Sequence, residues 1–287
     1  PEWVTPISTN YRGIRIYECP PNSQGIVALE TLNILESYDL QELDPASADL
    51  RHIQIEALRH AFTDAFDHVS DPNHEPVPVA RMLSQEHAES RRKMIDMRKV
   101  RPHPKTSRLS DGDTVYVTVV DKDHNAVSLI SSLYFGFGSG VVAGDTGILM
   151  QNRGVCFNLD IAHPNCLKPG KRAYHTIIPA LATRDNNLYL SFGLVGGHMQ
   201  AQGHVQLVNN LVDFGLDVQS ALDFPRFRLH RDTTVTLEDG HPAGVKSDLA
   251  SRGHILTHSV ADSTKFGGGQ IIAVDTDNKV LLGGSDP

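Results

Sequence analysis

The chain has 287 residues, of which 40% are hydrophobic and 21% charged, and its formal net charge at pH 7 is -8. These values predict one large or two small globular domains with a sizeable core. The mildly acidic balance argues against binding to nucleic acid or to an anionic membrane surface. Every apolar run is shorter than the roughly 20 residues of a transmembrane helix, so we expect no membrane span.

The three cysteines, Cys19, Cys156 and Cys166, are too few and too odd in number for a disulfide framework. Their spacing fits no structural zinc site. Free thiols favour a reducing compartment, so we favour a cytoplasmic location. The chain starts at Pro1 without an initiator Met or a signal-peptide pattern, as we expect of a processed or partial chain.

The first part of the chain is expected to be mostly helical. Apolar spacing predicts a helix over 25–38 with Ser23 as its cap, and charged helices follow. Pro102, Pro104 and a polar run to Gly112 then break regular structure. The other elements predicted here are a short strand at 15–17 and helices over 46–69 and 80–100.

From Thr114 onward the pattern changes to strands. Residues 114–120 have the β-branched and aromatic character of a buried strand, and a polar turn at 121–125 leads to a second apolar run. Helix-rich regions that flank hairpin-joined strands predict an α+β protein with largely antiparallel sheets. The remaining predictions are strands at 125–133, 146–150, 176–183, 188–192, 255–259, 270–275 and 279–283, and helices at 198–214, 218–224 and 242–252.

Local chemistry alone leaves alternatives open. Thr114 can be an ordinary strand start or a nucleophile released by cleavage of the chain before it. The glycine-rich run 193–197 lies between a strand and a helix, where backbone N–H groups form either an oxyanion hole or a tight turn. The glycine runs lack nucleotide-binding spacing, and the histidines are scattered, so we expect neither cofactor nor metal.

Several motifs, in the same order along nearly the whole chain, resemble gamma-glutamyltranspeptidases. Residues from Thr114 resemble the start of that family's small subunit, and residues 1–113 resemble the C-terminal part of its large subunit. The resemblance implies that the first part of the large subunit is a separate or missing partner. The motifs are Tyr11-Arg12-Gly13, Pro20-Pro21-Asn22-Ser23, 32–36, 114–123, 125–128, 137–140, 147–149, 169–172, Gly196-Gly197, Pro225-Arg226-Phe227 and Gly284-Ser285-Asp286-Pro287.

The family resemblance implies an N-terminal-nucleophile hydrolase with an αββα sandwich, in which segments 1–113 and 114–287 form one structural domain. The precursor would cleave itself between Asp113 and Thr114, and the freed α-amine would activate the Thr114 hydroxyl. Ser132 stands where the family has a threonine that binds this amine. Gly196 and Gly197 match the oxyanion-hole glycines. A small-molecule amide would acylate Thr114, and water or an amine would take the acyl group.

The acyl pocket departs from the family pattern. The family recognises the γ-glutamyl group with an Asn, a Gln, an Asp and a Ser-Ser pair, and those positions hold Tyr134, Arg153, Cys156 and the pair His175-Thr176. Without the Asp, an ammonium group would lose its partner, so we expect poor γ-glutamyl recognition. Such changes resemble a branch of the family that is often labelled cephalosporin acylase-like, which implies that amides of cephalosporin side chains are candidate substrates. Arg153 suits an acyl group with a carboxylate but no α-amine, such as glutaryl, although a structural ion pair is an alternative. Cys156 fits a buried small residue better than a reactive thiol.

Two further functions remain open. One is a true γ-glutamyl transferase or glutathione hydrolase with a rewired pocket, and the other is a catalytically idle family member that acts as a binding protein. The segment 158–171 corresponds to the position of a lid in some family members and is either a lid or a connector. Homo- and hetero-oligomers are both compatible with the sequence.

Overall fold

The computed structural model describes residues 2–101, 113–230, 234–257 and 263–286, and it combines helices and sheets in the expected α+β arrangement. Its largest sheet has six strands in the order β1-β2-β5-β6-β10-β11, and all neighbours are antiparallel. Strands from both sides of Thr114 therefore share one sheet. The bounds are β1 Ile7–Tyr11, β2 Ile14–Glu18, β5 Ala180–Arg184, β6 Asn187–Leu194, β10 Gly269–Asp275 and β11 Val280–Ser285.

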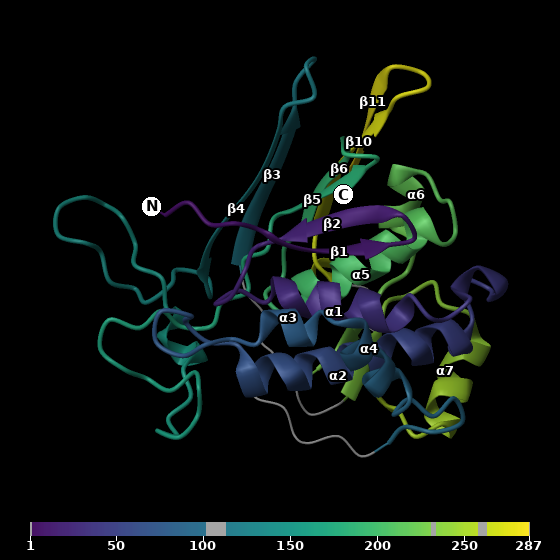
Figure 1. Cartoon of the computed structure of the whole chain (residues 1–287), viewed down its shortest axis with the longest axis horizontal. Coiled ribbons are helices and arrows are strands. Elements are labelled where there is room, and N and C mark those ends of the chain that lie inside the picture. Colours follow the sequence, from purple (N-terminus) through teal and green to yellow (C-terminus); the bar gives the residue numbers. More distant parts are fainter. Residues whose placement is uncertain (1, 102–112, 231–233, 258–262, 287) are drawn as a thin grey trace.

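Strands β3 and β4 form a separate antiparallel ribbon that projects beside the large sheet (Figure 1). They span Asp113–Val120 and Ala126–Tyr134, as the predicted hairpin requires. A small third sheet joins β7 Phe227–Leu229, β8 Thr234–Leu237 and β9 Ile255–Leu256.

The helices and the ribbon cover opposite faces of the large sheet. Neighbouring residues of a strand point to opposite faces. At the end of β6, a Cβ on Gly193 would meet the Tyr116 ring of the ribbon, whereas Leu194 contacts Gly203 of α5. Helix α1 packs on β1 and β2 and against α2 (Figure 1). The helices are α1 Gly25–Leu35, α2 Ala48–His68, α3 Val79–Met82, α4 Gln85–Arg92, α5 Met199–Val212, α6 Val218–Asp223 and α7 Ala243–Ser251, with short 3-10 turns at Leu40–Glu42, Arg153–Cys156 and Ser263–Phe266.

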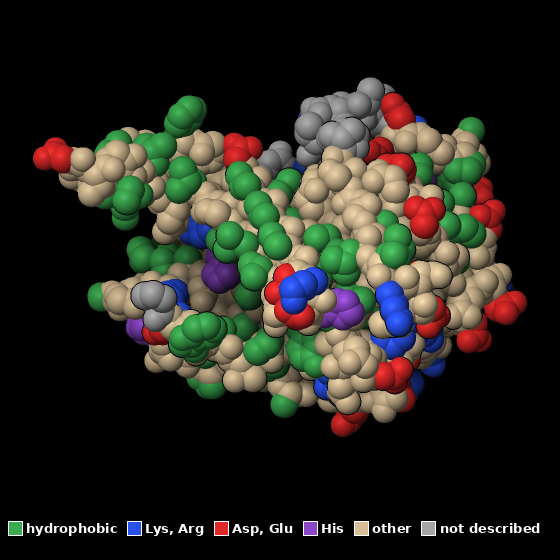
Figure 2. Space-filling model, turned by 90° about the horizontal axis from the view of Figure 1, so that it is seen from above, with side chains coloured by type: hydrophobic (Ala, Val, Ile, Leu, Met, Phe, Trp, Pro, Cys, Tyr) green, Lys and Arg blue, Asp and Glu red, His purple; other side chains and the backbone are tan. Residues whose placement is uncertain are grey.

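The expectation that β3 is a buried strand holds for one face only. Tyr116 points to the large sheet and is 7% exposed, whereas Val115, Val117 and Val119 are 67%, 47% and 53% exposed. Many exposed apolar side chains of the described residues lie on the outer face of the ribbon and in the loops that follow it, up to Leu167. Figure 2 shows such side chains on two projections at its left, with a hollow between them.

Two predicted elements are wrong. The helix over 80–100 is two short helices, because the Ser84 side chain accepts a hydrogen bond from His87 N and caps a new helix. The strand at 146–150 is a turn region with one bridge, between Val142 and Leu149, because Gly144 and Gly147 adopt positive φ.

Other boundaries shift for physical reasons. The predicted strand 176–183 begins only at Ala180, because Pro179 has no N–H for a central strand. Sequence reasoning missed β1, which joins β2 through Arg12 and Gly13 at φ +51° and +81°, and it also missed β7 and β8. The predicted break at 102–112 and part of the strand at 255–259 lie outside the described residues. Across the described chain, the structure contains no helix that is both long and apolar enough to cross a membrane.

Candidate active site

The hydroxyls of Thr114 and Ser132 meet at the start of the ribbon. Thr114 Oγ1 donates a hydrogen bond to Ser132 Oγ at 3.2 Å, and Ser132 Oγ donates to the carbonyl oxygen of Asp113 at 2.8 Å. Tyr134 N also donates to Ser132 Oγ, at 3.0 Å. A hydroxyl offers one donor and two acceptor positions, so Ser132 uses its full capacity. Ser132 therefore links the Thr114 hydroxyl to the carbonyl that precedes Thr114.

A β-bulge creates this arrangement. Asp113 pairs with Tyr134 while Thr114 pairs with Ser132, so Leu133 is an extra residue in β4. Tyr134 is a non-glycine residue at φ +83°, a conformation that is uncommon for a bulky side chain. Bulges are frequent beside active sites because they redirect side chains. Here the bulge turns the Ser132 hydroxyl toward the Asp113–Thr114 peptide.

The ribbon is held against the large sheet close to Thr114. Tyr116 and Thr114 share a strand face, and the Tyr116 ring lies directly over Gly193 of β6. The Tyr116 hydroxyl shares a hydrogen bond of 2.8 Å with Ser128 Oγ. Thr118 Oγ1 of β3 shares a hydrogen bond with Ser191 Oγ of β6. These contacts fix the position of Thr114 relative to the end of β6.

The glycine turn after β6 presents two N–H groups. Gly196 and Gly197 adopt φ +113° and +62°, and their carbonyls accept from Met199 N and Gln200 N at the start of α5. The N–H groups of Gly196 and Gly197 make no hydrogen bond within the described part of the chain. Since a helix N-terminus favours negative charge, the turn has the properties of an oxyanion hole.

A second glycine run supports this turn, and sequence reasoning missed it. Val195 N donates to Gly268 O at 2.9 Å, and a Cβ on Gly267 would lie 2.5 Å from Val195 O. The run Gly267-Gly268-Gly269 is visible in the sequence, and its three consecutive glycines are the signal that could have revealed a close backbone contact.

Arg153 is buried, and no carboxylate among the described residues pairs with it. Its side chain lies over the Tyr134 ring, 5.0 Å from the centroid, and Nη1 donates to Thr176 Oγ1 at 3.1 Å. Arg153 is 7% exposed, and its Nη2 has no hydrogen-bond partner among the described residues. No described carboxylate lies within ion-pair distance, so the alternative of a structural ion pair finds no support there. The structure thus leaves a desolvated positive charge next to Tyr134.

Cys156 and His175 are uncharged neighbours of Arg153. Burial raises the pKa of the Cys156 thiol, and a hydrogen bond with Tyr134 and the charge of Arg153 oppose this rise only in part. Burial, followed by the charges of Arg153 and Arg172, lowers the pKa of His175 to about 3. At neutral pH neither side chain can replace the carboxylate that a substrate ammonium would need.

Gln24 connects the region around Arg153 and Thr176 to the glycine turn at Gly197, and sequence reasoning did not predict this. It is fully buried just before α1, and its Nε2 donates to Thr176 O and to Gly197 O, each at 2.9 Å. The opposite amide orientation would place an oxygen against two carbonyls, so this assignment is the favourable one. Contacts therefore run without a gap from Thr114 through Ser132, Tyr134, Arg153, Thr176 and Gln24 to Gly197.

The segment 158–171 folds back on itself. Asn158 N donates to Asn165 O, and Leu167 N donates to Asn158 O, which closes a compact loop. The apolar tip residues Leu159 and Ile161 are 85% and 88% exposed. These two tip side chains are therefore open to solvent, and both readings of the segment, lid or connector, remain predictions.

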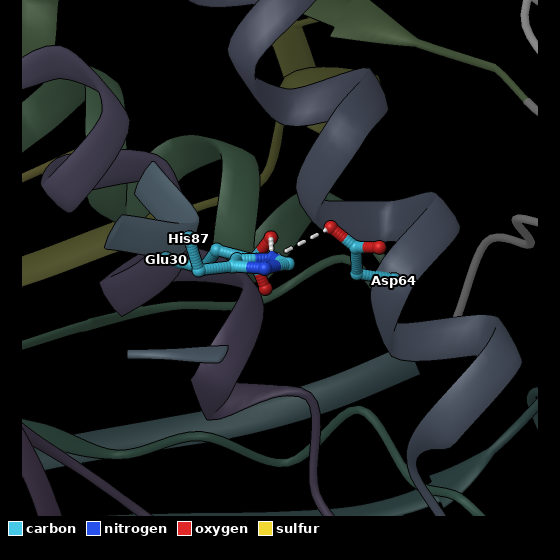
Figure 3. A group of neighbouring side chains, drawn as sticks. All are labelled: Glu30, Asp64 and His87. Atoms are coloured by element: carbon cyan, nitrogen blue, oxygen red, sulfur yellow. Dashed lines mark hydrogen bonds and ion pairs between the residues drawn. The ribbon is translucent and has the colours of Figure 1, made fainter. Parts of the chain in front are cut away.

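One group of metal-type side chains occurs in the described chain, where none was expected. Ligand atoms of Glu30, Asp64 and His87 lie within 4.8 Å of one another (Figure 3). However, the Arg91 guanidinium bonds both oxygens of Asp64. Burial and the hydrogen bond with Asp64 raise the pKa of Glu30 well above its usual value, which favours its protonated form. A cation would have to displace Arg91 and that proton, so the group does not suit a metal.

Comparisons with known proteins agree with this geometry. A family profile described as Gamma-glutamyltranspeptidase matches residues 1–287. The glutathione hydrolase-like YwrD proenzyme of Bacillus subtilis (strain 168) is 39% identical over 292 residues, which cover 100% of this chain and 55% of that protein. The glutathione hydrolase proenzyme of Escherichia coli (strain K12) is 33% identical over 99% of this chain and 51% of its own length. This chain thus spans about half the length of these curated relatives.

A solved structure extends the similarity to the fold. The cephalosporin acylase from Bacillus halodurans superposes with a TM-score of 0.91 at 47% identity, and the match covers 100% of this chain and 52% of the acylase chain. The match runs through both the helix-rich first part and the Thr114 ribbon, as the order of the sequence motifs requires. The chain therefore belongs to the gamma-glutamyltranspeptidase family, with the N-terminal-nucleophile hydrolase fold of its relatives.

Proposed function

We propose that this protein is a self-processing amidohydrolase or acyltransferase whose nucleophile is Thr114. The observation that carries the proposal is the Ser132 hydroxyl, which accepts from Thr114 Oγ1 at 3.2 Å and donates to the Asp113 carbonyl at 2.8 Å. The same hydroxyl thus touches the attacking atom and the oxygen on which negative charge would develop. The relatives named as proenzymes support a role in self-cleavage.

Self-cleavage then proceeds as an acyl shift. Thr114 Oγ attacks the Asp113 carbonyl carbon, and Ser132 stabilises the resulting oxyanion. The bond from Asp113 carbon to Thr114 nitrogen breaks, and that nitrogen takes the proton lost by the hydroxyl. Water hydrolyses the resulting ester, which leaves a carboxylate on Asp113 and both a free hydroxyl and a free amine on Thr114.

The free amine supplies the base for turnover. An α-amine has a pKa of about 8, so an appreciable neutral fraction can accept the proton of the Thr114 hydroxyl. The N–H groups of Gly196 and Gly197 are available for the oxyanion of a substrate amide. The substrate's leaving amine departs with that proton, and water or another amine takes the acyl group from Thr114.

The proposed acyl group carries a carboxylate and no α-ammonium. Arg153 offers a buried positive charge, and its Nη2 has no hydrogen-bond partner in the described part of the chain. Cys156 and His175 offer an ammonium no negative charge. A glutaryl-like or cephalosporin side-chain amide fits this pocket, and the acylase relative supports it. The alternative, a γ-glutamyl donor, is supported by the relatives named glutathione hydrolase, and it would need an ammonium partner outside the described residues.

The curated relatives are about twice as long as this chain, and their additional polypeptide suggests a partner for the apolar outer face of the ribbon. Val115, Val117 and Leu129 of the ribbon are 67%, 47% and 58% exposed. We propose that a polypeptide corresponding to the first part of the large subunit covers this face and completes the fourth layer. This packing would bury valines and leucines that a folded enzyme rarely leaves in one exposed patch.

The complete polypeptide tests the nucleophile. After incubation at neutral pH, a denaturing gel with intact mass should show two fragments, the second starting at Thr114, and Thr114→Ala should stay uncut and inactive. Ser132→Ala should slow cleavage, whereas Ser131→Ala on the exposed face should not. A persistently uncut wild-type chain without activity would favour the idle binding protein, and cleavage of Thr114→Ala would rule out this mechanism.

Matched substrates test the pocket. Glutaryl anilide should be turned over faster than γ-glutamyl anilide, and Arg153→Met should remove the advantage. A much faster reaction with γ-glutamyl anilide would contradict the proposed acyl group while leaving Thr114 as the nucleophile.

A further inference from the structure

Gln24 is the only described side chain that bonds both the wall of the acyl pocket and the glycine turn. Its backbone N donates to His175 O at 2.9 Å, and His175 N donates to Asn22 O at 3.0 Å, so residues 22–24 lie alongside 175–176. From this fixed position, one amide nitrogen reaches Thr176 O and Gly197 O at 2.9 Å each. Gln24 belongs to the segment before the proposed cleavage site, whereas both acceptors lie after it.

The two carbonyls that Gln24 bonds lie next to Arg153 and in the glycine turn. The Thr176 side chain accepts a hydrogen bond from Arg153, which pairs with no carboxylate of the described residues. Gly197 O also accepts from Gln200 N at 3.2 Å, and with Gly196 it supplies the free N–H groups of the turn. Any movement of Arg153 and Thr176 toward a bound anion therefore acts on Gly197 most directly through Gln24. Gln200, whose side chain accepts from Ile178 N and whose backbone N donates to Gly197 O, is a second and longer link.

We propose that Gln24 is a positioning residue that couples recognition of the acyl carboxylate to the alignment of the oxyanion turn. The proposal rests on the proposed function of Thr114 and adds a specificity device to it. When the carboxylate engages Arg153, Thr176 is held in place, and Gln24 holds the Gly197 carbonyl so that the neighbouring N–H groups face the reacting carbonyl. An acyl group without a carboxylate leaves Arg153 and Thr176 free to move, and the turn is then less well aligned.

A double-mutant cycle tests this coupling in the complete, self-cleaved protein. The substrates are a glutaryl anilide and a pentanoyl anilide, which has a methyl group in place of the carboxylate. In the wild type we expect a kcat for glutaryl that exceeds that for pentanoyl by about tenfold or more. Gln24→Met removes both donors at similar size and should bring the ratio of the two kcat values close to one, mainly by lowering kcat for glutaryl. Arg153→Met should do the same, and the double variant should be no worse than the worse single variant.

Gln206 provides a matched control. It is buried in α5, and its Nε2 likewise donates to two backbone carbonyls, Gln202 O at 3.1 Å and Phe227 O at 3.0 Å. Gln206→Met removes this pair of bonds and also the bond that Gln206 Oε1 accepts from Phe227 N at 2.9 Å, all away from the pocket, so it should lower stability without changing the ratio of kcat values. If Gln24→Met does not fold, Gln24→Asn, which is one methylene too short to reach both carbonyls, replaces it.

The outcomes separate the two proposals. Four results would overturn the coupling. Two are additive effects of the Gln24 and Arg153 substitutions and an effect of Gln24→Met on KM alone. The other two are a changed ratio of kcat values in Gln206→Met and failure of both Gln24 variants to self-cleave. Turnover of neither anilide by the wild type, or activity of Thr114→Ala, would overturn the proposed function itself.

Discussion

Replacing Gly193 by Ala should displace Thr114, the proposed nucleophile, although Thr114 itself is unchanged. A Cβ at this position would lie 2.5 Å from Cε2, 2.7 Å from Cζ and 2.8 Å from Cδ2 of Tyr116. The ring has little freedom to yield, because Tyr116 is 7% exposed and its hydroxyl is bonded to Ser128. The strain must therefore be relieved by moving the ribbon away from the large sheet.

The structure gives the size of the effect. Ordinary contact begins at 3.4 Å, so the ring must retreat by roughly 0.9 Å, and overpacking of this kind costs about 1–3 kcal/mol of unfolding free energy. Thr114 lies two residues before Tyr116 on the same strand face. A displacement of about 1 Å in a catalytic group can cost about 100-fold in rate, so we expect Gly193→Ala to lower kcat by about 10- to 100-fold.

Steady-state turnover of an anilide, the extent of self-cleavage and urea unfolding measure these effects separately. Gly244→Ala in α7 is the control, because a Cβ there meets nothing within 4 Å. Adding Tyr116→Leu to Gly193→Ala restores room and should recover part of the lost kcat. Wild-type turnover by Gly193→Ala, or no recovery in the double variant, would refute the steric argument.

Three further predictions concern stability. Asp286→Asn should lower the unfolding free energy by about 1.5–3 kcal/mol, because it weakens the charged hydrogen bonds of 2.8 and 3.0 Å from Arg226 and leaves Glu238, at 3.7 Å, as the remaining charge partner of this buried side chain; urea unfolding would test this. Burial lowers the pKa of His254 to about 3, so the unfolded chain gains this proton near pH 6.5 and the folded chain only near pH 3. Stability should therefore fall as pH drops through this window, and His254→Gln should flatten the fall by up to about 1.4 kcal/mol per pH unit. The raised pKa of Glu30 beside Asp64 predicts a protonated side chain, so Glu30→Gln should not lower stability at pH 7, and a loss above about 1 kcal/mol would contradict the protonated state.

The Thr114–Ser132 contact could be predicted from the sequence. A polar turn at 121–125 sets the hairpin register, and the register that pairs Val120 with Ala126 also pairs Thr114 with Ser132. The bulge at Asp113 could not be foreseen, because no glycine marks it. Family resemblance singled out both hydroxyls, and the structure adds the direction of their hydrogen bonds.

The contacts of Gln24 could not be predicted from the sequence, because they join distant segments of the chain. Its acceptors lie 152 and 173 residues away along the chain, and neither helical nor strand periodicity relates such positions. Local rules proposed Ser23 as the helix cap. Ser23 Oγ does accept from Gly25 N at 3.3 Å and also donates to Cys19 O, but the residue directly before the helix is Gln24. Contacts of this kind depend on how the segments before and after Thr114 pack, and no local propensity encodes that packing.

The exposed valines of β3 show how a correct pattern can lead to an incomplete prediction. The alternation in 114–120 places hydroxyl and aromatic side chains on one face and valines on the other. The polar face packs on the large sheet, and the apolar face of Val115, Val117 and Val119 is open. A strand selected to be exposed would carry polar residues there, so the valines support the proposed burial of this face. The prediction of a buried strand thus becomes a prediction about the proposed partner polypeptide, whose docking should protect the β3 amides from hydrogen exchange.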